Sequence, residues 1–332
     1  MTSVLFIVLN WNGKKDTLKC LGSLRGQSIS HSVVVVDNNS RDGSIEAISK
    51  QFPDVLILAQ KKNRGFAGGV NVGIRYAIKN GFDKVALFNN DAIADPKWLE
   101  SLVAGMKKSR ASIVTGLLLD ARGETIDDTG EFYSTWGVSF ARNRNEPVEA
   151  APKAGFVFGA TGGASLYKTS LFKEIGLFDE SFFAYYEDID LSFRAQLAGH
   201  KVYYTDKAVA CHERGSTSKK ISGFGVYQTF KNLPLLYTKN VPVGLLFPIG
   251  IRLLLLYVLI FGNAVKNGDG VHALKGWLAS VGYFWTRAIW LRPIIQLRRK
   301  VSSDDIYSIL YRDLPPEQTG MRKLRKFFTG KD

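Results

Sequence analysis

"SVLFIVLNWNGKKDTLKCLGSLRGQSISHSVVVVDNNS", residues 3–40, joins two apolar runs through a segment whose leucines recur every three residues. The runs at 3–9 and 33–36 are short, rich in β-branched residues and closed by polar turns, which is typical of parallel strands buried on both faces. The leucine spacing between them predicts a helix over 14–25. Together these elements form a β-α-β unit.

The same alternation continues further along the chain. It predicts, in order, a helix over 44–51, a strand over 55–59, a helix from about 69 to 79 and a strand over 84–88. Short strands and glycine-rich turns from about 112 to 165 then predict an antiparallel or mixed extension of the sheet, and helices follow over 170–176 and 187–198. We therefore expect an α/β fold with a doubly wound mixed sheet flanked by helices, followed by a helical C-terminal extension.

The composition describes a folded and strongly basic chain. Its 332 residues are 45% hydrophobic and carry a formal net charge of +14, and the residues from 241 onward hold 14 Lys and Arg against 6 Asp and Glu. An anionic partner is therefore expected, although charge alone does not distinguish nucleic acid, a membrane surface and phosphorylated substrates. Because only Cys20 and Cys211 are present and the N-terminus lacks signal-peptide features, we expect a cytoplasmic protein without disulfides or structural zinc.

The apolar stretch VPVGLLFPIGIRLLLLYVLIFG, residues 241–262, has the length to span a bilayer. Pro242, Pro248 and Arg252 interrupt it, and the segment at 283–300 alternates bulky apolar residues with arginine, as an interfacial segment does. The sequence thus favours peripheral attachment to the inner face of the cell membrane. A transmembrane span and an ordinary buried pair of helices stay open as alternatives.

Polar side chains follow three of the predicted parallel strands, at 10–13 (NWNG), 37–44 (DNNSRDGS) and 89–92 (NNDA). Ligands of doubly wound sheets bind at the carboxyl ends of the strands, so the functional site is expected here. Asp37 can accept the imide N–H of a uracil or thymine ring. The alternative is that Asp37 only caps the following helix.

The glycine-rich segment KNRGFAGGVNVGIRYA, residues 62–77, resembles a phosphate-binding loop but matches neither the P-loop nor the dinucleotide motif. Glycines such as Gly65 permit close backbone approach, and the helix N-terminus behind them favours an anion. Asn63 and Asn71 bracket the turn, where they either contact a ligand or satisfy backbone groups. Arg64 either contacts a diphosphate or is solvated.

Asp91, in LFNNDA, comes two residues after a buried strand and is the expected metal ligand, with Asn89 in the place of the first acid of a D-x-D. One carboxylate is enough, because Mg²⁺ keeps waters and takes phosphate oxygens. His212 follows another short apolar strand and can complete the metal shell, although a lone histidine is more often structural.

A predicted helix begins directly behind four aromatic residues in FFAYYEDIDLSFRAQLAG, residues 182–199. At about 100° per residue, Asp190 and Arg194 form a surface pair and Glu187 projects close to Arg194, whereas Asp188 projects about 120° away from it. Asp188 at the helix N-terminus, beside aromatic walls, is therefore a candidate general base. The alternative is that these acids only complement the helix dipole.

Taken together, these motifs and their order resemble the family 2 glycosyltransferases of GT-A fold, most of all the bacterial rhamnosyltransferase-type members that build surface polysaccharides. The resemblance covers about residues 3–217 and implies a catalytic domain at 1–217. The apolar, aromatic and basic composition of the remainder predicts a helical, membrane-associating extension at 218–332. The resemblance also implies an inverting transfer from a nucleotide-diphosphate sugar, dTDP-rhamnose or a UDP-sugar, with Mg²⁺ or Mn²⁺ as cofactor.

The resemblance also implies a role for each site residue. Asp188, with Glu187 beside it, is the catalytic base, and Asp91 and His212 hold the metal. The donor-nucleotide residues are Leu9, Asn10, Asn12, Asp37, Asn39, Asn63, Arg64, Gly65, Asn71, Asn89 and Asn90. Those of the acceptor and sugar pocket are Gly162, Gly163, Phe183, Tyr185 and Tyr186, although some of these aromatics would be plain core residues.

The implied acceptor is a polyprenyl-diphosphate-linked or glycan hydroxyl at the membrane surface, and a homodimer is left open. A sugar-nucleotide nucleotidyltransferase is the nearest alternative enzyme, but NWNGKK is a poor version of the basic glycine-rich loop that it needs after the first strand. A non-catalytic protein that binds anionic lipid or nucleic acid would explain the charge, but it predicts no acids at the strand ends. We therefore expect no nucleic-acid partner.

Overall fold

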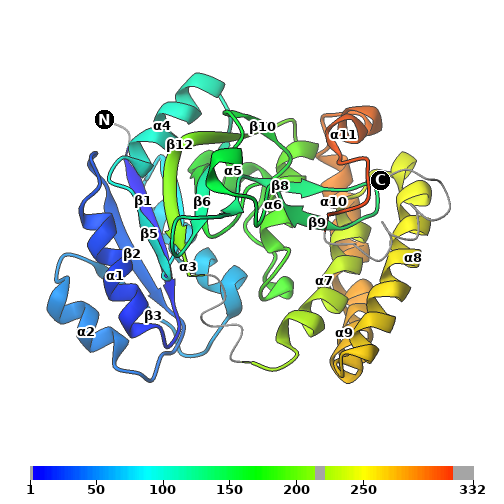
Figure 1. Ribbon diagram of the computed structural model, residues 1–332, viewed down its shortest axis with the longest axis horizontal. Coiled ribbons are helices and arrows are strands. Elements are labelled where there is room, and N and C mark those ends of the chain that lie inside the picture. The colour runs from blue at the N-terminus through cyan, green and yellow to red at the C-terminus, as the bar shows by residue number, and fades with distance from the viewer. Residues whose placement is uncertain (1–2, 214–220, 317–332) are drawn as a thin grey trace.

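A computed structural model describes residues 3–213 and 221–316. It contains a large mixed sheet with helices on both faces and a group of C-terminal helices at one end (Figure 1). The expected fold class is therefore confirmed. The expected domain boundary at 217/218 falls outside the described residues and stays a prediction.

The N-terminal half of the sheet is the predicted β-α series. Its elements are β1 (Val4–Asn10), α1 (Lys14–Arg25), β2 (Ser32–Asp37), α2 (Ser44–Gln51), β3 (Leu56–Ala59), α3 (Gly65–Lys79) and β4 (Lys84–Asn89). α3 begins four residues earlier than expected, because Gly65 takes a left-handed φ of 68° and its N–H is bonded to the side chain of Asn63 at 2.8 Å. The glycine-rich segment is thus the first turn of a helix and not a free loop.

The second half extends the sheet as predicted. Its strands and helices are β5 (Ala92–Ala94), α4 (Trp98–Ser109), β6 (Ile113–Asp120), β7 (Ile126–Asp128), β8 (Glu131–Tyr133), β9 (Ser139–Ala141), η1 (Val148–Ala150), β10 (Gly155–Val157), β11 (Ala164–Lys168), α5 (Thr169–Ile175), η2 (Glu180–Phe182), α6 (Glu187–Leu197) and β12 (Val202–His212).

The strand order is β10-β12-β6-β11-β4-β1-β2-β3, and β11 runs antiparallel to both of its neighbours. Because β11 is reversed, its first residues lie beside the carboxyl end of β4, where Ala164 pairs with Phe88. The Gly162-Gly163 turn just before β11 therefore reaches the strand-end edge at which the site is expected.

Two apolar cores cover the two faces of the sheet. On one face, residues of β1 and β2 pack against Val70 and Ile74 of α3 and against α5 and α6. On the other face, they pack against Leu21 of α1 and Trp98 of α4. Burial on both faces explains why the strands read as continuous apolar runs.

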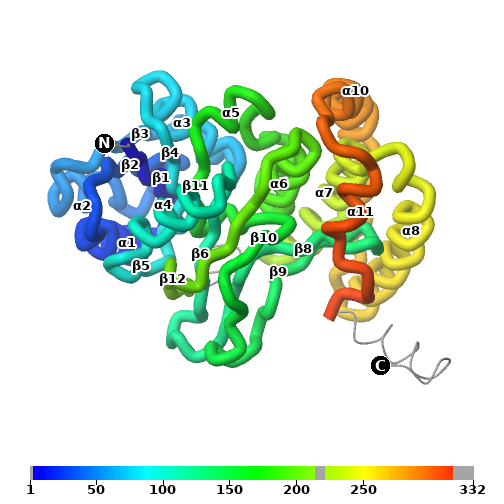
Figure 2. Tube along the Cα trace, turned by 90° about the horizontal axis from the view of Figure 1, so that it is seen from above, coloured from blue at the N-terminus to red at the C-terminus, as the bar shows by residue number. Residues whose placement is uncertain are grey.

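The C-terminal helices are α7 (Phe224–Asn240), α8 (Val243–Lys266), α9 (Gly270–Tyr283), the π-helical turn η4 (Phe284–Ala288), α10 (Ile289–Leu297) and α11 (Ser303–Ile309). They gather at the end of the molecule away from α2 (Figure 2). The expected interruption of the apolar stretch at Pro248 and Arg252 was wrong, because α8 is one continuous helix of 24 residues. Pro248 lies only five residues after its first residue, where little of the helix precedes the missing N–H.

α7 joins these helices to the sheet domain. Its Leu235 and Leu236 share one apolar core with Tyr133 of β8 and with Ile189 and Phe193 of α6. Figure 1 shows α7 between α6 and the outer helices α8 and α9. The C-terminal helices are therefore packed directly onto the helix that carries the candidate base.

Candidate active site

Asp37 and Asn10 end two adjacent parallel strands and face each other in register. Asn10 Nδ2 donates to Asp37 Oδ2 at 2.7 Å, and the N–H of Ser40 donates to Asp37 Oδ1 at 2.8 Å. Asn90 Nδ2 reaches Asn10 Oδ1 at 3.5 Å and Thr17 Oγ1 at 3.0 Å. These bonds bring the ends of β1, β2 and β4 together.

The turns after β1 and β2 are joined by a hydrogen bond. Asn12 and Asn39 both take left-handed φ values, 51° and 70°. Asn12 Oδ1 accepts the N–H of Arg41 at 2.7 Å. Leu9 packs against α3 at Gly69, where an added Cβ would collide with the leucine side chain. The predicted nucleotide residues in these turns are thus neighbours.

Asn38 is a residue that the sequence reasoning missed. Its Nδ2 donates to the carbonyl of Gly65 at 2.9 Å, and its buried Oδ1 has no hydrogen-bond partner among the described residues. The only sequence feature that could have indicated Asn38 as a site residue is its place directly after a predicted strand. By contrast, the side-chain amide of Asn71 donates to the carbonyl of Phe178 and accepts the N–H of the same residue. Arg64 forms an ion pair with Glu180 at 3.7 Å. These contacts give Asn71 a structural role.

The turn before β11 connects the end of β4 with Asp188. Asn89 donates its N–H to the carbonyl of Gly163 at 2.7 Å, and Gly162 donates its N–H to Asp188 Oδ2 at 3.0 Å. A Cβ on Gly162 would collide with Phe66, and one on Gly163 would collide with Asn89. The two glycines therefore allow the close approach that puts Asp188 beside the strand-end edge.

His212, at the end of β12, lies between two carboxylates. Its Nε2 is 3.2 Å from Asp91 Oδ1, and its Nδ1 is 2.8 Å from Asp127 Oδ2. Burial opposes the charged ring, but hydrogen bonds and charge from Asp127 and Asp91 outweigh it and raise the pKa of His212 to about 9. Asp127, on the short strand β7, was missed because nothing near it in the sequence suggests a histidine partner.

The donor set fits a divalent ion only in part. Asp91 Oδ1 and His212 Nε2 have about the spacing of adjacent ligands on an octahedral ion, whose ligands lie at about 2.1 Å. In the described part of the chain, no group of three or more His, Cys, Asp or Glu residues forms a metal site. An ion here would therefore need further ligands, such as the oxygens of a diphosphate.

Glu187, which is buried, and Asp188, which is partly buried, form an acidic pair at the start of α6. Burial raises the pKa of Glu187 well above its usual range, and the charge of Asp188 raises it further. Burial also raises the pKa of Asp188, although hydrogen bonds from the N–H groups of Gly162 and Ile189 lower it. Glu187 Oε2 is buried without a hydrogen-bond partner among the described residues. Glu187 is therefore the better holder of a shared proton, which leaves Asp188 ionised.

The expected surface pair of Asp190 and Arg194 forms, at 2.9 Å, but it is buried, with side chains 0% and 7% exposed. Lys239 and Asn240 of α7 also contact Asp190, each at 2.8 Å. The prediction that this pair lies at the surface was wrong, because α7 covers this face of α6. Despite its burial, the pKa of Asp190 is lowered by the charges of Lys239 and Arg194.

The aromatic residues ahead of α6 have different roles. Phe182 is fully buried, and Tyr186 packs against the cores beside α7. Tyr185 is 41% exposed and lies next to Phe224, as Phe183 also does. Phe183, Tyr185 and Tyr186 all take left-handed φ values. Phe182 is thus a core residue, whereas the pocket roles of Phe183, Tyr185 and Tyr186 stay predictions.

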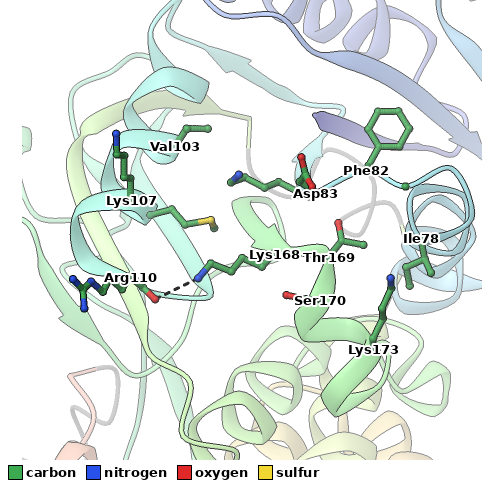
Figure 3. A pocket seen from close by; sticks show the side chains of 13 residues that line it. Ile78, Phe82, Asp83, Val103, Lys107, Arg110, Lys168, Thr169, Ser170 and Lys173 are labelled. Atoms are coloured by element: carbon green, nitrogen blue, oxygen red, sulfur yellow. Dashed lines mark hydrogen bonds between the residues drawn. The ribbon is translucent and has the colours of Figure 1, made fainter. Parts of the chain in front are cut away.

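A hollow of about 720 Å³ lies at the opposite end of the strands. It is lined by Lys84, Lys107, Lys168 and Lys173 among others, and Lys168 bonds the carbonyl of Arg110 (Figure 3). Lys84 and Lys168 pair across β4 and β11 at the start of β4. This hollow is therefore separate from the candidate site.

Comparison with known proteins identifies the class. Among solved structures, the fold matches S. aureus TarS 1–349 in complex with UDP-GlcNAc, with a TM-score of 0.57 and 17% identity over 93% of this chain and 90% of that chain. It also matches mannosyltransferase PcManGT from Pyrobaculum calidifontis, in complex with GDP-Man and Mn²⁺, with a TM-score of 0.52 and 14% identity over 98% and 81% of the two chains. The fold is that of the GT-A glycosyltransferases.

The model of glycosyl transferase family 2 matches residues 5–176, and the chain belongs to this family. It is 25% identical to the low-salt glycan biosynthesis hexosyltransferase Agl10 of Haloferax volcanii over 68% of this chain and 72% of the relative. It is 26% identical to an N-acetylglucosaminyl-diphospho-decaprenol L-rhamnosyltransferase of Mycobacterium tuberculosis (56% and 68%), and 22% identical to the dTDP-rhamnosyl transferase RfbF of Shigella flexneri (72% and 81%). The protein is a glycosyltransferase, and its rhamnosyltransferase-like resemblance is confirmed.

Proposed function

We propose that this glycosyltransferase moves a sugar, with rhamnose favoured, from a nucleotide-diphosphate donor to an acceptor hydroxyl, with inversion and with help from Mg²⁺ or Mn²⁺. The observation that carries the proposal is that Asp37, Asn89 and Asp188 lie at one edge of the sheet. Hydrogen bonds connect Asp37 through Asn10 to Asn90, the neighbour of Asn89. Others connect Asn89 to Gly163 and the adjacent Gly162 to Asp188. Two of the relatives are rhamnosyltransferases by name, which supports the choice of sugar.

Asp188 is the base of the proposed reaction. Its raised pKa makes the ionised carboxylate a stronger acceptor for the proton of a hydroxyl. The acceptor oxygen forms a new bond to the anomeric carbon as the bond to the diphosphate breaks, and the leaving oxygen takes the electron pair. Because the attack comes from the opposite face, one step inverts the configuration.

Asp91 and His212 would hold the divalent ion, which neutralises charge on the departing diphosphate when it is bound. Asp127 fixes the ring of His212 through Nδ1, so that Nε2 faces Asp91. The N–H groups of Gly65 and Ala67 in the first turn of α3 are already bonded to Asn63 and Phe183, so this turn favours the same anion through the positive end of its helix dipole.

Donor assays test this function. UDP-, dTDP- and GDP-sugars would be compared by thermal stabilisation and by metal-dependent donor hydrolysis, with Asp91→Ala and Asp188→Asn as variants. We expect Asp91→Ala to lose the metal dependence and Asp188→Asn to keep donor binding without turnover. Formation of a sugar nucleotide from a nucleoside triphosphate and a sugar phosphate would instead support the nucleotidyltransferase alternative.

We also propose that the protein is cytoplasmic and lies on the inner membrane face, where a polyprenyl-linked acceptor is presented. Helices α8 to α10 carry many large apolar side chains that are exposed, and we call this region the apolar surface of α8–α10. One of these helices, α8, is long and apolar enough to cross a membrane. Only 22% of the most apolar window of α8 is buried. Members more than 50% exposed are Val243, Phe247, Ile251, Leu254, Leu255, Val258, Val265, Val271, Leu278, Trp285, Trp290 and Leu297.

A lipid surface suits this region better than a second protein chain, because arginine and lysine flank the apolar residues. Arg287, Arg298 and Lys300 are exposed near Trp290 in the sequence. Such a combination of aromatic, aliphatic and basic side chains is typical of segments that lie at a membrane interface.

Vesicles of phosphatidylglycerol and phosphatidylethanolamine test the attachment by co-sedimentation. We expect Phe247→Glu with Trp290→Glu to release the protein, whereas Leu56→Glu, an exposed apolar residue on β3, would not. Unchanged sedimentation of the double variant would contradict the proposal. A dimer in solution that the double variant abolishes would assign this surface to a second copy.

A further inference from the structure

The turn over 182–186, directly before the candidate base, has an unfavourable backbone. Phe183, Tyr185 and Tyr186 have φ values of 64°, 68° and 71°, a region that bulky side chains rarely adopt. Such conformations persist only when the surroundings hold them in place. Glu187 and Asp188 follow directly, so their positions depend on whatever holds this turn.

Asn232 of α7 holds the turn from one side. Its Nδ2 lies 3.0 Å from the carbonyl oxygen of Phe182, 3.0 Å from that of Ala184 and 2.8 Å from that of Tyr185. The side chain is fully buried. Three carbonyl groups of one turn thus lie within hydrogen-bond distance of one amide nitrogen, whose two N–H groups they share, and this fixes the path of the backbone.

Lys231 adds a second buried donor and a positive charge. Its Nζ donates to the carbonyls of Ser181 and Phe182, both at 3.0 Å. Burial lowers the pKa of Lys231 to about 8, while the nearby charge of Glu187 acts in the opposite direction. The ammonium therefore bonds two carbonyls of the turn and lies near enough to Glu187 to interact with its carboxyl group.

The opposite side of the turn rests on the donor-binding segment. The carbonyl of Phe183 accepts the N–H of Ala67 at 3.2 Å. A Cβ on Gly65 would collide with the same carbonyl. The turn is therefore clamped between the first turn of α3 and α7, and a shift of the turn would move Asp188 relative to the bound donor.

We propose that Asn232 and Lys231 are positioning residues for glycosyl transfer: they fix the turn over 182–186 so that Asp188 faces the acceptor hydroxyl. This inference rests on the proposed role of Asp188 as base. It assigns a part of the reaction geometry to the C-terminal helices. The expected division into a catalytic domain and an appended extension would then separate residues that act together.

The test compares Asn232→Ala and Lys231→Met with Phe230→Leu. Phe230 is a buried neighbour on α7 that packs toward Ala264 and Ala273, away from the turn. We expect Asn232→Ala and Lys231→Met to lower kcat by roughly 30-fold or more, because small displacements of reacting groups are costly. The donor KM and the affinity for UDP or dTDP should change less than about threefold, because the nucleotide site is built on other residues.

The control separates positioning from stability. Phe230→Leu should lower the melting temperature without an effect on kcat. A kcat in both test variants within about threefold of wild type, or no lower than that of Phe230→Leu, would overturn the inference. If Asn232→Ala does not fold, Lys231→Met decides alone.

Asp188→Asn, assayed in parallel, distinguishes the two proposals. An inactive Asp188→Asn with an active Asn232→Ala would overturn only the positioning role. A fully active Asp188→Asn would overturn the proposed base and, with it, the inference drawn from it.

Discussion

Asp188 and Asp190 lie two residues apart on α6, yet their surroundings differ in kind. Asp190 is enclosed by Lys239, Arg194 and Asn240, and the charges of Lys239 and Arg194 lower its pKa despite its burial. Asp188 is held by the backbone N–H groups of Gly162 and Ile189, and burial raises its pKa. A carboxylate paired with cations serves the structure, whereas one held by neutral donors beside a ligand site can still take a proton.

Among the substitutions that test this comparison, Asp188→Asn should have the largest effect on activity. The amide cannot accept the hydroxyl proton, so kcat should fall about 1000-fold, within the usual range for loss of a general base. The melting temperature should rise, because a partly buried carboxylate with a raised pKa costs stability when it is ionised at neutral pH. Steady-state assays and thermal melts would measure both, and a lower melting temperature would contradict the described environment.

Asp190→Asn should have the opposite effect on stability. Removal of this carboxylate leaves Lys239 and Arg194 buried with one fewer counter-charge, so the free energy of unfolding should fall by about 3 kcal/mol. Denaturant unfolding at pH 7 would measure the change. An Asp190→Asn protein as stable as wild type, or more stable, would break the comparison.

The contributions of Asp188 and Asp190 should also be lost at different pH values on acidification. Activity needs ionised Asp188, so it should be lost as the pH falls through the raised pKa of that group. Asp190 has a lowered pKa in the fold, so its stabilisation is present above the unfolded value of about 3.9 and is lost only below it. Activity and circular dichroism followed over the same pH range should show loss of rate before loss of fold, and simultaneous loss would count against the comparison.

Asp127 extends the comparison to a carboxylate that orients a histidine, and its effect should be smaller. Asp127→Asn should weaken Mn²⁺ binding about tenfold, as loss of an outer partner of a metal-bound histidine usually does. Wild-type affinity should rise with pH up to about 9, because the ion must displace the proton on His212. Electron paramagnetic resonance of free Mn²⁺ measures both. Equal affinities of the variant and wild type would remove Asp127 from this role.

The sequence was sufficient for the fold and for the difference between the two acids. β-branched runs and helical leucine spacing set the first β-α units, and the projection around α6 separated Asp188 from Arg194. These features depend on local periodicity. The position of the acids behind a strained turn was not predictable, because φ values above zero at Phe183 and Tyr186 are imposed by distant contacts.

The contacts that the sequence did not indicate all join residues far apart in the chain. Lys239 reaches Asp190 across 49 positions, and His212 reaches Asp127 across 85. Both contacts depend on how α7 and β12 pack, which a single sequence does not encode in any local pattern. The burial of the Asp190–Arg194 pair was misjudged for the same reason, whereas the continuity of α8 was misjudged because Pro248 lies close to the start of the helix.

The most direct measurement is a carbon-13 NMR titration of the aspartate carboxyl groups, with the Asp188 signal assigned by its loss in Asp188→Asn. The account predicts that this signal titrates above the usual aspartate value of about 3.9. An Asp188 signal that titrates at or below that value would contradict the claim that its environment prepares it to accept a proton.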